Sequence, residues 1–189
     1  MAILTRSNTP LYEGHYVTRE EYLDLPDDGF RYDMIEGVLH MSPSPYFSHN
    51  QCQTNISYYF KDYFIRKKSG LVVVETDVFL PDGGDVVRPD LSVILKENYK
   101  IIIGHIHGVP DIVCEVLSES TRDRDLGIKA ARYLANGVKE YWIADPDKKS
   151  IEMWMNQDKN SWRKISGNEI AGSVLSGFIL RQVDVFPKD

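Results

Sequence analysis

Hydrophobic residues in the first third of the chain recur at spacings typical of helices and of strands. Thr18 can cap a short helix through residue 23, and the segment 30–41 predicts a hairpin or a bent strand that can reverse at Gly37. Apolar side chains at positions 56, 59, 60, 63 and 64 follow the three- and four-residue spacing of a helix with one buried face. Ser48 can cap this long helix and Gly70 can end it.

The rest of the chain is dominated by short runs of β-branched and apolar residues. These runs predict strands at 71–80, 86–95, 111–117, 141–144, 151–155, 162–165 and 183–186. Pro89 makes the second strand irregular, because a proline cannot donate a hydrogen bond to a neighbouring strand. A further helix is predicted over 123–136, with Gly137 as its stop. This order indicates an α/β fold with a mixed central β-sheet flanked by α-helices and an added C-terminal β segment.

Size and composition fit one globular domain. The chain has 189 residues, and we assign 1–17 to an N-terminal arm and 18–189 to a single domain. No apolar run is long enough to cross a bilayer, and the polar N-terminus lacks a signal-peptide stretch, so we expect a cytoplasmic protein. The formal net charge of −6 argues against a protein that coats nucleic acid non-specifically. Cys52 and Cys114 are expected to be buried free thiols.

Two carboxylates carry the most information about chemistry. Glu115 interrupts an apolar run, and a glutamate in a strand covered on both faces is costly unless it is paired or binds a cation. Asp90 lies in a different strand-like run, where the Pro-Asp dipeptide alone would indicate no more than a turn. Two carboxylates on neighbouring strands can hold one Mg²⁺ and leave room for water and a phosphate. A structural salt bridge is the alternative for Glu115.

A basic residue that can reach these carboxylates lies in the predicted helix 123–136. Leu126, Ala130, Tyr133 and Leu134 are expected to form its buried face, and at about 100° per residue Lys129 borders that face. The helix could therefore present the Lys129 ammonium toward the strand carboxylates. An ordinary solvated surface lysine is the alternative.

Several stretches between residues 18 and 146 together form a recognisable pattern. They are 31–37 (RYDMIEG), 41–45 (MSPSP) with His49, 88–91 (RPDL), 110–118 (PDIVCEVLS), Asp125, Lys129 and Tyr133, and 137–142 (GVKEYW). In this order they resemble the Uma2 family of restriction-endonuclease-like proteins, a branch of the PD-(D/E)xK nuclease superfamily. The resemblance implies a nuclease-like fold, with Asp90 and Glu115 as metal ligands.

Two departures from the superfamily pattern bear on the site. The superfamily places a lysine two residues after the acidic residue, where this chain has Leu117. In this branch the lysine is expected to have moved to the helix, which supports Lys129. The family usually has glutamate at the position of Asp33, so either Asp33 still reaches the site or Glu36 substitutes for it as third carboxylate.

The remaining candidates are basic. The family resemblance makes His49, at the start of the long helix, a candidate contact to a phosphate or to metal-bound water, with a structural histidine as the alternative. Arg122, Arg124 and Arg132 surround the candidate site in sequence. They can contact phosphates or form an ordinary solvated helix face.

The leading hypothesis is a Mg²⁺-dependent endonuclease that hydrolyses DNA, with Mn²⁺ as a possible substitute metal and duplex DNA as the expected substrate. Asp90 and Glu115 would bind the metal, and Lys129, Asp33 and His49 complete the candidate catalytic set. A homodimer would suit cleavage of both strands of a duplex. One rival hypothesis is a non-catalytic binding or assembly module of the same fold, which the acidic net charge and the Asp33 substitution favour. Another is a metal-dependent hydrolase of a different phosphodiester.

Overall fold

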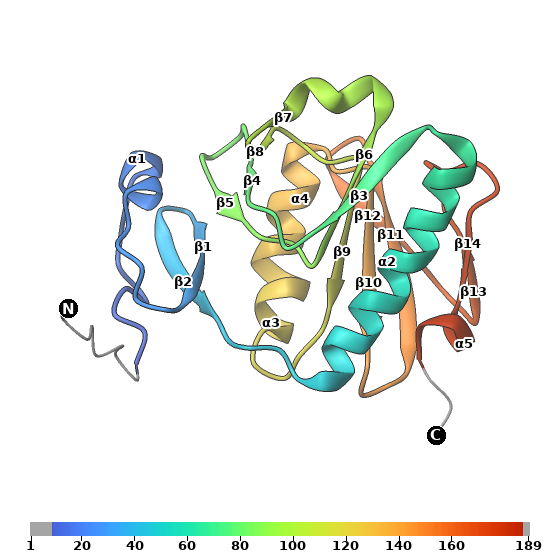
Figure 1. Cartoon of the computed structure of the whole chain (residues 1–189), viewed down its shortest axis with the longest axis horizontal. Helices are drawn as coiled ribbons and strands as arrows, with labels where there is room; N and C mark the ends of the chain where they lie inside the picture. Colours follow the sequence, from blue (N-terminus) through green and yellow to red (C-terminus); the bar gives the residue numbers. More distant parts are fainter. Residues whose placement is uncertain (1–8, 187–189) are drawn as a thin grey trace.

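A mixed six-stranded sheet, here called the central sheet, forms the middle of the computed structural model, which describes residues 9–186 (Figure 1). Its strands, in spatial order, are β12 (Ser161–Ser166), β11 (Ser150–Gln157), β10 (Glu140–Asp145), β9 (Ile112–Val116), β6 (Leu91–Leu95) and β3 (Gly70–Val74). Strands β9 and β10 run parallel, and the other neighbours in this sheet are antiparallel. The predicted mixed sheet is therefore confirmed.

A second sheet, here called the side sheet, is built mostly from very short strands. In spatial order they are β2 (Val38–Ser42), β1 (Arg31–Ile35), β5 (Val86–Val87), β4 (Val78–Phe79), β8 (His105–His107) and β7 (Ile102–Ile103). Strands β1 and β2 form the predicted hairpin, and its turn places Glu36 and Gly37 in the left-handed region, with φ of 53° and 78°. Of residues 9–17, the described part of the predicted arm, the stretch 14–17 lies along β2, where Leu39 N donates to His15 O.

Helices cover both faces of the central sheet (Figure 1). One layer contains α2 (Phe47–Lys67), β13 (Glu169–Ala171), β14 (Ile179–Arg181) and α5 (Gln182–Val185), and the other contains α3 (Arg122–Arg124), the π-helical segment η2 (Asp125–Lys129) and α4 (Ala130–Asn136). Alternation along β9 sends Ile112, Cys114 and Val116 toward α2, whereas Val113 packs with Tyr133 of α4. Glu115 points to the same side of β9 as Val113, so its side chain lies among the residues of the η2 and α4 layer.

Shorter helices complete the described part of the chain. Helix α1 (Arg19–Leu23) begins with the predicted Thr18 cap, and Glu21 returns a hydrogen bond to Thr18 N to complete a capping box. The segment η1 (Lys96–Ile101) connects β6 to β7. No helix within residues 9–186 is long and apolar enough to cross a membrane. Cys52 and Cys114 are buried and form no disulfide, as predicted.

Two predicted strands are interrupted, and both interruptions move the chain between sheets. The predicted strand 71–80 ends at Val74 and resumes as β4, because Glu75 adopts a left-handed φ of 44°. The predicted strand 86–95 is divided at 88–90, where Pro89 lies between β5 and β6. Asp90 therefore immediately precedes β6 and does not lie inside a strand, which corrects the expectation from sequence.

The predicted helix ends also need correction. Helix α2 begins after Tyr46, which makes no side-chain cap, so Ser48 is not its cap. Lys68, with φ of 53°, closes the helix in place of Gly70. Gly70 instead opens β3, where an added β-carbon would lie 2.7 Å from the backbone oxygen of Ile94. The predicted strand 183–186 is wrong as well, because most of it forms α5 and the C-terminal β structure comes from β13 and β14.

The π-helical segment changes which face of the helix is buried. A π turn contains more residues than an α turn, so each residue advances by less than the 100° assumed from sequence. Leu126, predicted to be buried, is 36% exposed, whereas Asp125 and Lys129 are each 3% exposed. The helix therefore turns two charged side chains inward, toward the central sheet.

Candidate active site

A pocket of about 490 Å³, here called the site pocket, opens beside the start of β6 and the end of β9. These two ends are adjacent because β6 and β9 are antiparallel, with Leu91 opposite Cys114. The start of α2, the loop after β2, residues 29–32, the loop after β9 and the η2 segment supply further walls. Asp90, Glu115, His49 and Lys129 all line this pocket.

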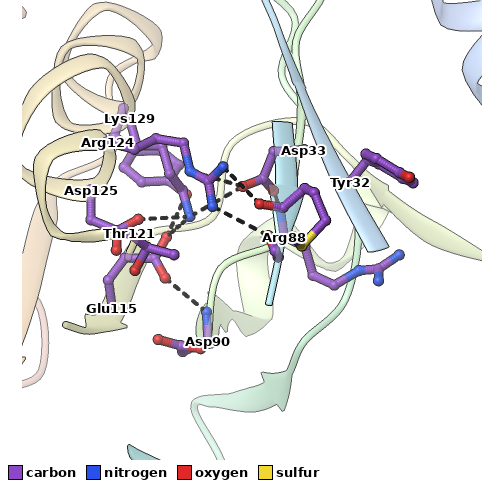
Figure 2. Close-up of polar contacts among 12 residues, drawn as sticks. Tyr32, Asp33, Arg88, Asp90, Glu115, Thr121, Arg124, Asp125 and Lys129 are labelled. Atoms are coloured by element: carbon purple, nitrogen blue, oxygen red, sulfur yellow. Dashed lines mark hydrogen bonds and ion pairs between the residues drawn. The ribbon is translucent and has the colours of Figure 1, made fainter. Parts of the chain in front are cut away.

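Glu115 is held in the floor of the site pocket by three donors. Its Oε1 lies 2.5 Å from Lys129 Nζ and accepts a 2.9 Å hydrogen bond from the Tyr133 hydroxyl. Its Oε2 accepts from Asp90 N at 3.1 Å (Figure 2). Burial raises the pKa of Glu115 well above its usual range, and the charges of Asp125 and Asp90 add to this, although Lys129 opposes it. A further positive charge in the pocket would favour the loss of this proton.

Lys129 is buried among carboxylates. Its Nζ is 3.3 Å from Asp125 Oδ1 and 3.7 Å from Asp33 Oδ2, in addition to the contact with Glu115. Burial alone would lower the pKa of Lys129, but the charges of Asp33, Glu115 and Asp125 outweigh it and raise that pKa. The ammonium therefore stays charged, and the solvated-surface alternative for Lys129 is wrong.

Asp90 and His49 form a second pair at the edge of the same pocket. Asp90 Oδ2 accepts from Val116 N at 2.6 Å and lies 3.2 Å from His49 Nε2. Burial opposes protonation of His49, but the hydrogen bond and charge of Asp90 outweigh it, so the pKa of His49 is raised. The other ring nitrogen, Nδ1, is buried and has no hydrogen-bond partner within residues 9–186. The hydrogen-bonding capacity of this nitrogen is therefore unused by the described residues.

Asp33 and Glu36 occupy very different places. Asp33 is 1% exposed; its Oδ1 accepts from Arg88 N at 2.8 Å, and its Oδ2 approaches Lys129 (Figure 2). Glu36 is exposed in the β1–β2 turn, where its backbone N donates to Asp85. Asp33, and not Glu36, is thus the carboxylate that reaches the cluster, although it lies behind Lys129 and does not line the pocket.

The three candidate arginines differ in their partners and in whether they line the site pocket. Arg122 forms a bidentate pair with Asp145, at 2.7 and 3.0 Å, and Arg132 pairs with the buried Asp85. Arg124 alone of the three lines the site pocket, where its Nη1 donates to Met41 O at 3.1 Å. Its buried Nε has no hydrogen-bond partner in the described chain.

Sequence reasoning missed several polar residues around Asp90 and Glu115. Gln53 Nε2 donates to Asp90 O and to Glu75 Oε1, each at 3.2 Å. Its position four residues after His49, on the same helix face, could have indicated this role. Ser118 and Thr121 line the pocket with their hydroxyls 2.9 Å apart. Glu75 carried no recognisable signal, because only the interruption after β3 brings it to the site.

The donor set can be tested against the metal that the resemblance implies. Within residues 9–186, no three histidine, cysteine or acidic side chains are arranged to hold a metal ion. Asp90 Oδ1, however, receives no hydrogen bond in the described chain, and Glu115 Oε2 accepts only the Asp90 N–H. Mg²⁺ is commonly held by one or two carboxylates and keeps several waters. Asp90 and Glu115 therefore fit a divalent cation held through two protein ligands.

The mixed sheet, its flanking helices and the pocket of carboxylates with one lysine define an α/β protein with a buried acidic site. The chain belongs to the Uma2 family, described as "Putative restriction endonuclease", whose family model matches residues 19–181. Its fold is similar to the crystal structure of "a putative nuclease belonging to DUF820" from Anabaena variabilis, with a TM-score of 0.77 and 19% identity over 90% of this chain and 97% of that chain. No curated protein matches the chain. The family read from sequence is confirmed.

Proposed function

We propose that this chain is a Mg²⁺-dependent endonuclease that hydrolyses phosphodiester bonds of DNA. The observation that carries the proposal is the convergence of Asp90, Glu115 and Lys129 on one pocket. Carboxylates at the end of a buried strand, next to a permanently charged ammonium, are suited to bind a cation and a phosphate together. Membership of a family of restriction-endonuclease-like proteins supports this reading.

Asp90 and Glu115 would hold the metal, and Mn²⁺ could replace Mg²⁺. When bound, a divalent metal supplies an activated water and offsets charge on the scissile phosphate. Tyr133 fixes the orientation of the Glu115 carboxylate through its hydroxyl, and the Val116 N–H fixes that of Asp90. Both ligands are therefore held in place before a metal arrives.

Lys129 acts on the reacting groups in this proposal. Its ammonium borders the pocket, where it orients the attacking water and stabilises negative charge on the phosphate. Asp33 and Asp125 are positioning residues, since they contact the ammonium. His49 Nδ1 and the Arg124 guanidinium are the candidate phosphate contacts, because each has a buried nitrogen without a hydrogen-bond partner in the described chain. Arg124 Nε also lies 3.9 Å from Asp33 Oδ2. A homodimer would let two such sites cut both strands of a duplex.

The direct test is nicking of supercoiled plasmid by the purified protein with Mg²⁺ or Mn²⁺. We expect metal-dependent conversion to nicked and linear DNA, and no conversion with a chelator. Metal binding without cleavage under varied salt and pH would favour the non-catalytic binding module. Cleavage of small phosphodiesters alone would favour the other metal-dependent hydrolase.

Metal affinity is expected to rise with pH. Glu115 has a raised pKa, so in the metal-free protein it retains its proton above the ordinary pKa of a glutamate, which is about 4.3. Metal binding must displace that proton, so affinity increases until pH exceeds the raised pKa of Glu115. Calorimetry in two buffers of different ionisation enthalpy measures the released proton directly. Affinity that is independent of pH, with no proton release, would contradict Glu115 as a ligand.

A further inference from the structure

A second cavity, here called the side pocket, has a volume of about 500 Å³ and adjoins the site pocket. Residues 29–32 and Arg88 line both cavities and form the wall between them. Tyr32 and the side chain of Arg88 extend away from the Lys129 cluster (Figure 2). A strand of nucleic acid with its phosphate in the site pocket would therefore pass beside this second cavity.

The side pocket is lined by four aromatic rings, two of which are held by hydrogen bonds from their hydroxyls. They belong to Tyr12, Tyr22, Phe30 and Tyr32. The Tyr22 hydroxyl donates to Tyr32 O at 3.0 Å, and the Tyr32 hydroxyl donates to Asp28 Oδ2 at 2.6 Å. The rings of Tyr12 and Tyr32 meet edge to face, with centroids 5.9 Å apart. A planar ligand would thus enter a cavity whose walls are already ordered.

Arg88 gives the side pocket a directional donor. Its Nε donates to Asp77 Oδ1 at 2.6 Å, which fixes the plane of the guanidinium. Its two terminal nitrogens donate no hydrogen bond to residues 9–186, and its side chain is 20% exposed. Arg31, exposed on the shared wall, adds a positive charge between the two cavities.

We infer that the side pocket binds an unstacked nucleobase, with a preference for guanine. Aromatic rings stack on the face of any base, whereas an arginine fork matches the adjacent O6 and N7 acceptors of guanine. The position of this base next to the scissile phosphate rests on the proposed function. Base binding itself requires no catalysis, so base binding and nuclease activity can be tested separately.

The test is calorimetric titration of the full chain with the four deoxynucleoside 5′-monophosphates and with inorganic phosphate. We expect dGMP to bind most tightly and inorganic phosphate more weakly than any nucleotide. Phe30→Leu, which removes a ring, should weaken binding of all four nucleotides by about tenfold. Arg88→Lys keeps a charge beside Asp77 but loses the fork, so it should reduce the preference for dGMP by about tenfold.

Matched controls lie elsewhere on the surface. Tyr58→Leu removes an exposed ring on α2, and Arg66→Lys alters an exposed arginine paired with Asp62; neither should change nucleotide affinity. Equal affinity for all four nucleotides and phosphate would overturn the inference, as would wild-type binding by both Phe30→Leu and Arg88→Lys. Plasmid cleavage without nucleotide selectivity would contradict the base-binding inference alone. Selective binding of dGMP without cleavage would instead contradict the proposed nuclease activity alone.

Discussion

Lys129→Ala is expected to lower the free energy of unfolding by about 3–5 kcal/mol, because it strips a buried ammonium from Asp33, Glu115 and Asp125. Cleavage by the molecules that remain folded should fall by about 10²–10³-fold, the usual cost of losing a group that stabilises transition-state charge. Urea denaturation measures the first effect, and plasmid nicking below the melting temperature measures the second. Divalent metal should restore part of the lost stability, since a bound cation again neutralises the carboxylates.

Lys139→Ala is the matched control for that experiment. Lys139 also pairs with a buried carboxylate, that of Asp111, at 2.6 Å, but it does not line the site pocket. The Lys139→Ala variant should have a lower free energy of unfolding than the wild type, and its folded molecules should cleave at the wild-type rate. If Lys129→Ala behaved in the same way as Lys139→Ala, the lysine would be structural and the assignment of a role in the reaction would be wrong.

Asp90→Asn should eliminate the metal-dependent rise in melting temperature and reduce plasmid nicking by about 10²–10³-fold or more. Asparagine keeps an oxygen that can accept the Val116 N–H, so the loop before β6 can stay in place while the negative charge is lost. In the wild type, metal at about 100 times its Kd stabilises the fold by about 2.7 kcal/mol. Thermal melting with and without Mg²⁺ or Mn²⁺ measures the difference.

Asp145→Asn is the control that distinguishes loss of a metal ligand from loss of a structural carboxylate. Asp145 is more deeply buried than Asp90, with a side chain that is 7% exposed against 16%. Arg122 neutralises it outside the site pocket, and the hydrogen bond from Arg122 lowers its pKa. This variant should lose stability and keep the full metal-induced shift. An unchanged metal shift in Asp90→Asn would remove Asp90 from the ligand set.

Glu115 could be found from sequence because a carboxylate in an apolar strand is costly, and Asp90 and Lys129 were then found as residues that could share its site. Glu115 stands out in an apolar strand, and strand alternation places it on the side of α4. The sequence predicts Lys129 at the border of the buried face and not inside it, because no local pattern indicates the π segment that turns it inward. The family resemblance brought attention to His49 and Asp33, which residue patterns alone would have left as ordinary polar side chains.

The contacts that could not be predicted from sequence depend on where the chain passes from one sheet to the other. The break at Pro89 lets Arg88 line both cavities while Asp90 lines the site pocket alone, and the break after Val74 brings Glu75 to Gln53. Both breaks lie in runs that read as single strands. Which residue of such a run leaves the sheet is decided by packing against distant elements, such as the bond from Arg88 N to Asp33.

The number of residues between Thr121 and Gly137 is itself a determinant of the charge cluster. Gly127 lies in the π segment, is exposed, and has no atom within 4 Å of where a β-carbon would stand. Deleting it would replace the π turn by a regular α turn, which contains fewer residues. Asp125 would then stand three positions before Lys129 instead of four, so its carboxylate would approach the ammonium from a different angle. A single insertion or deletion, with every charged residue retained, thus changes how the carboxylates are arranged around one lysine.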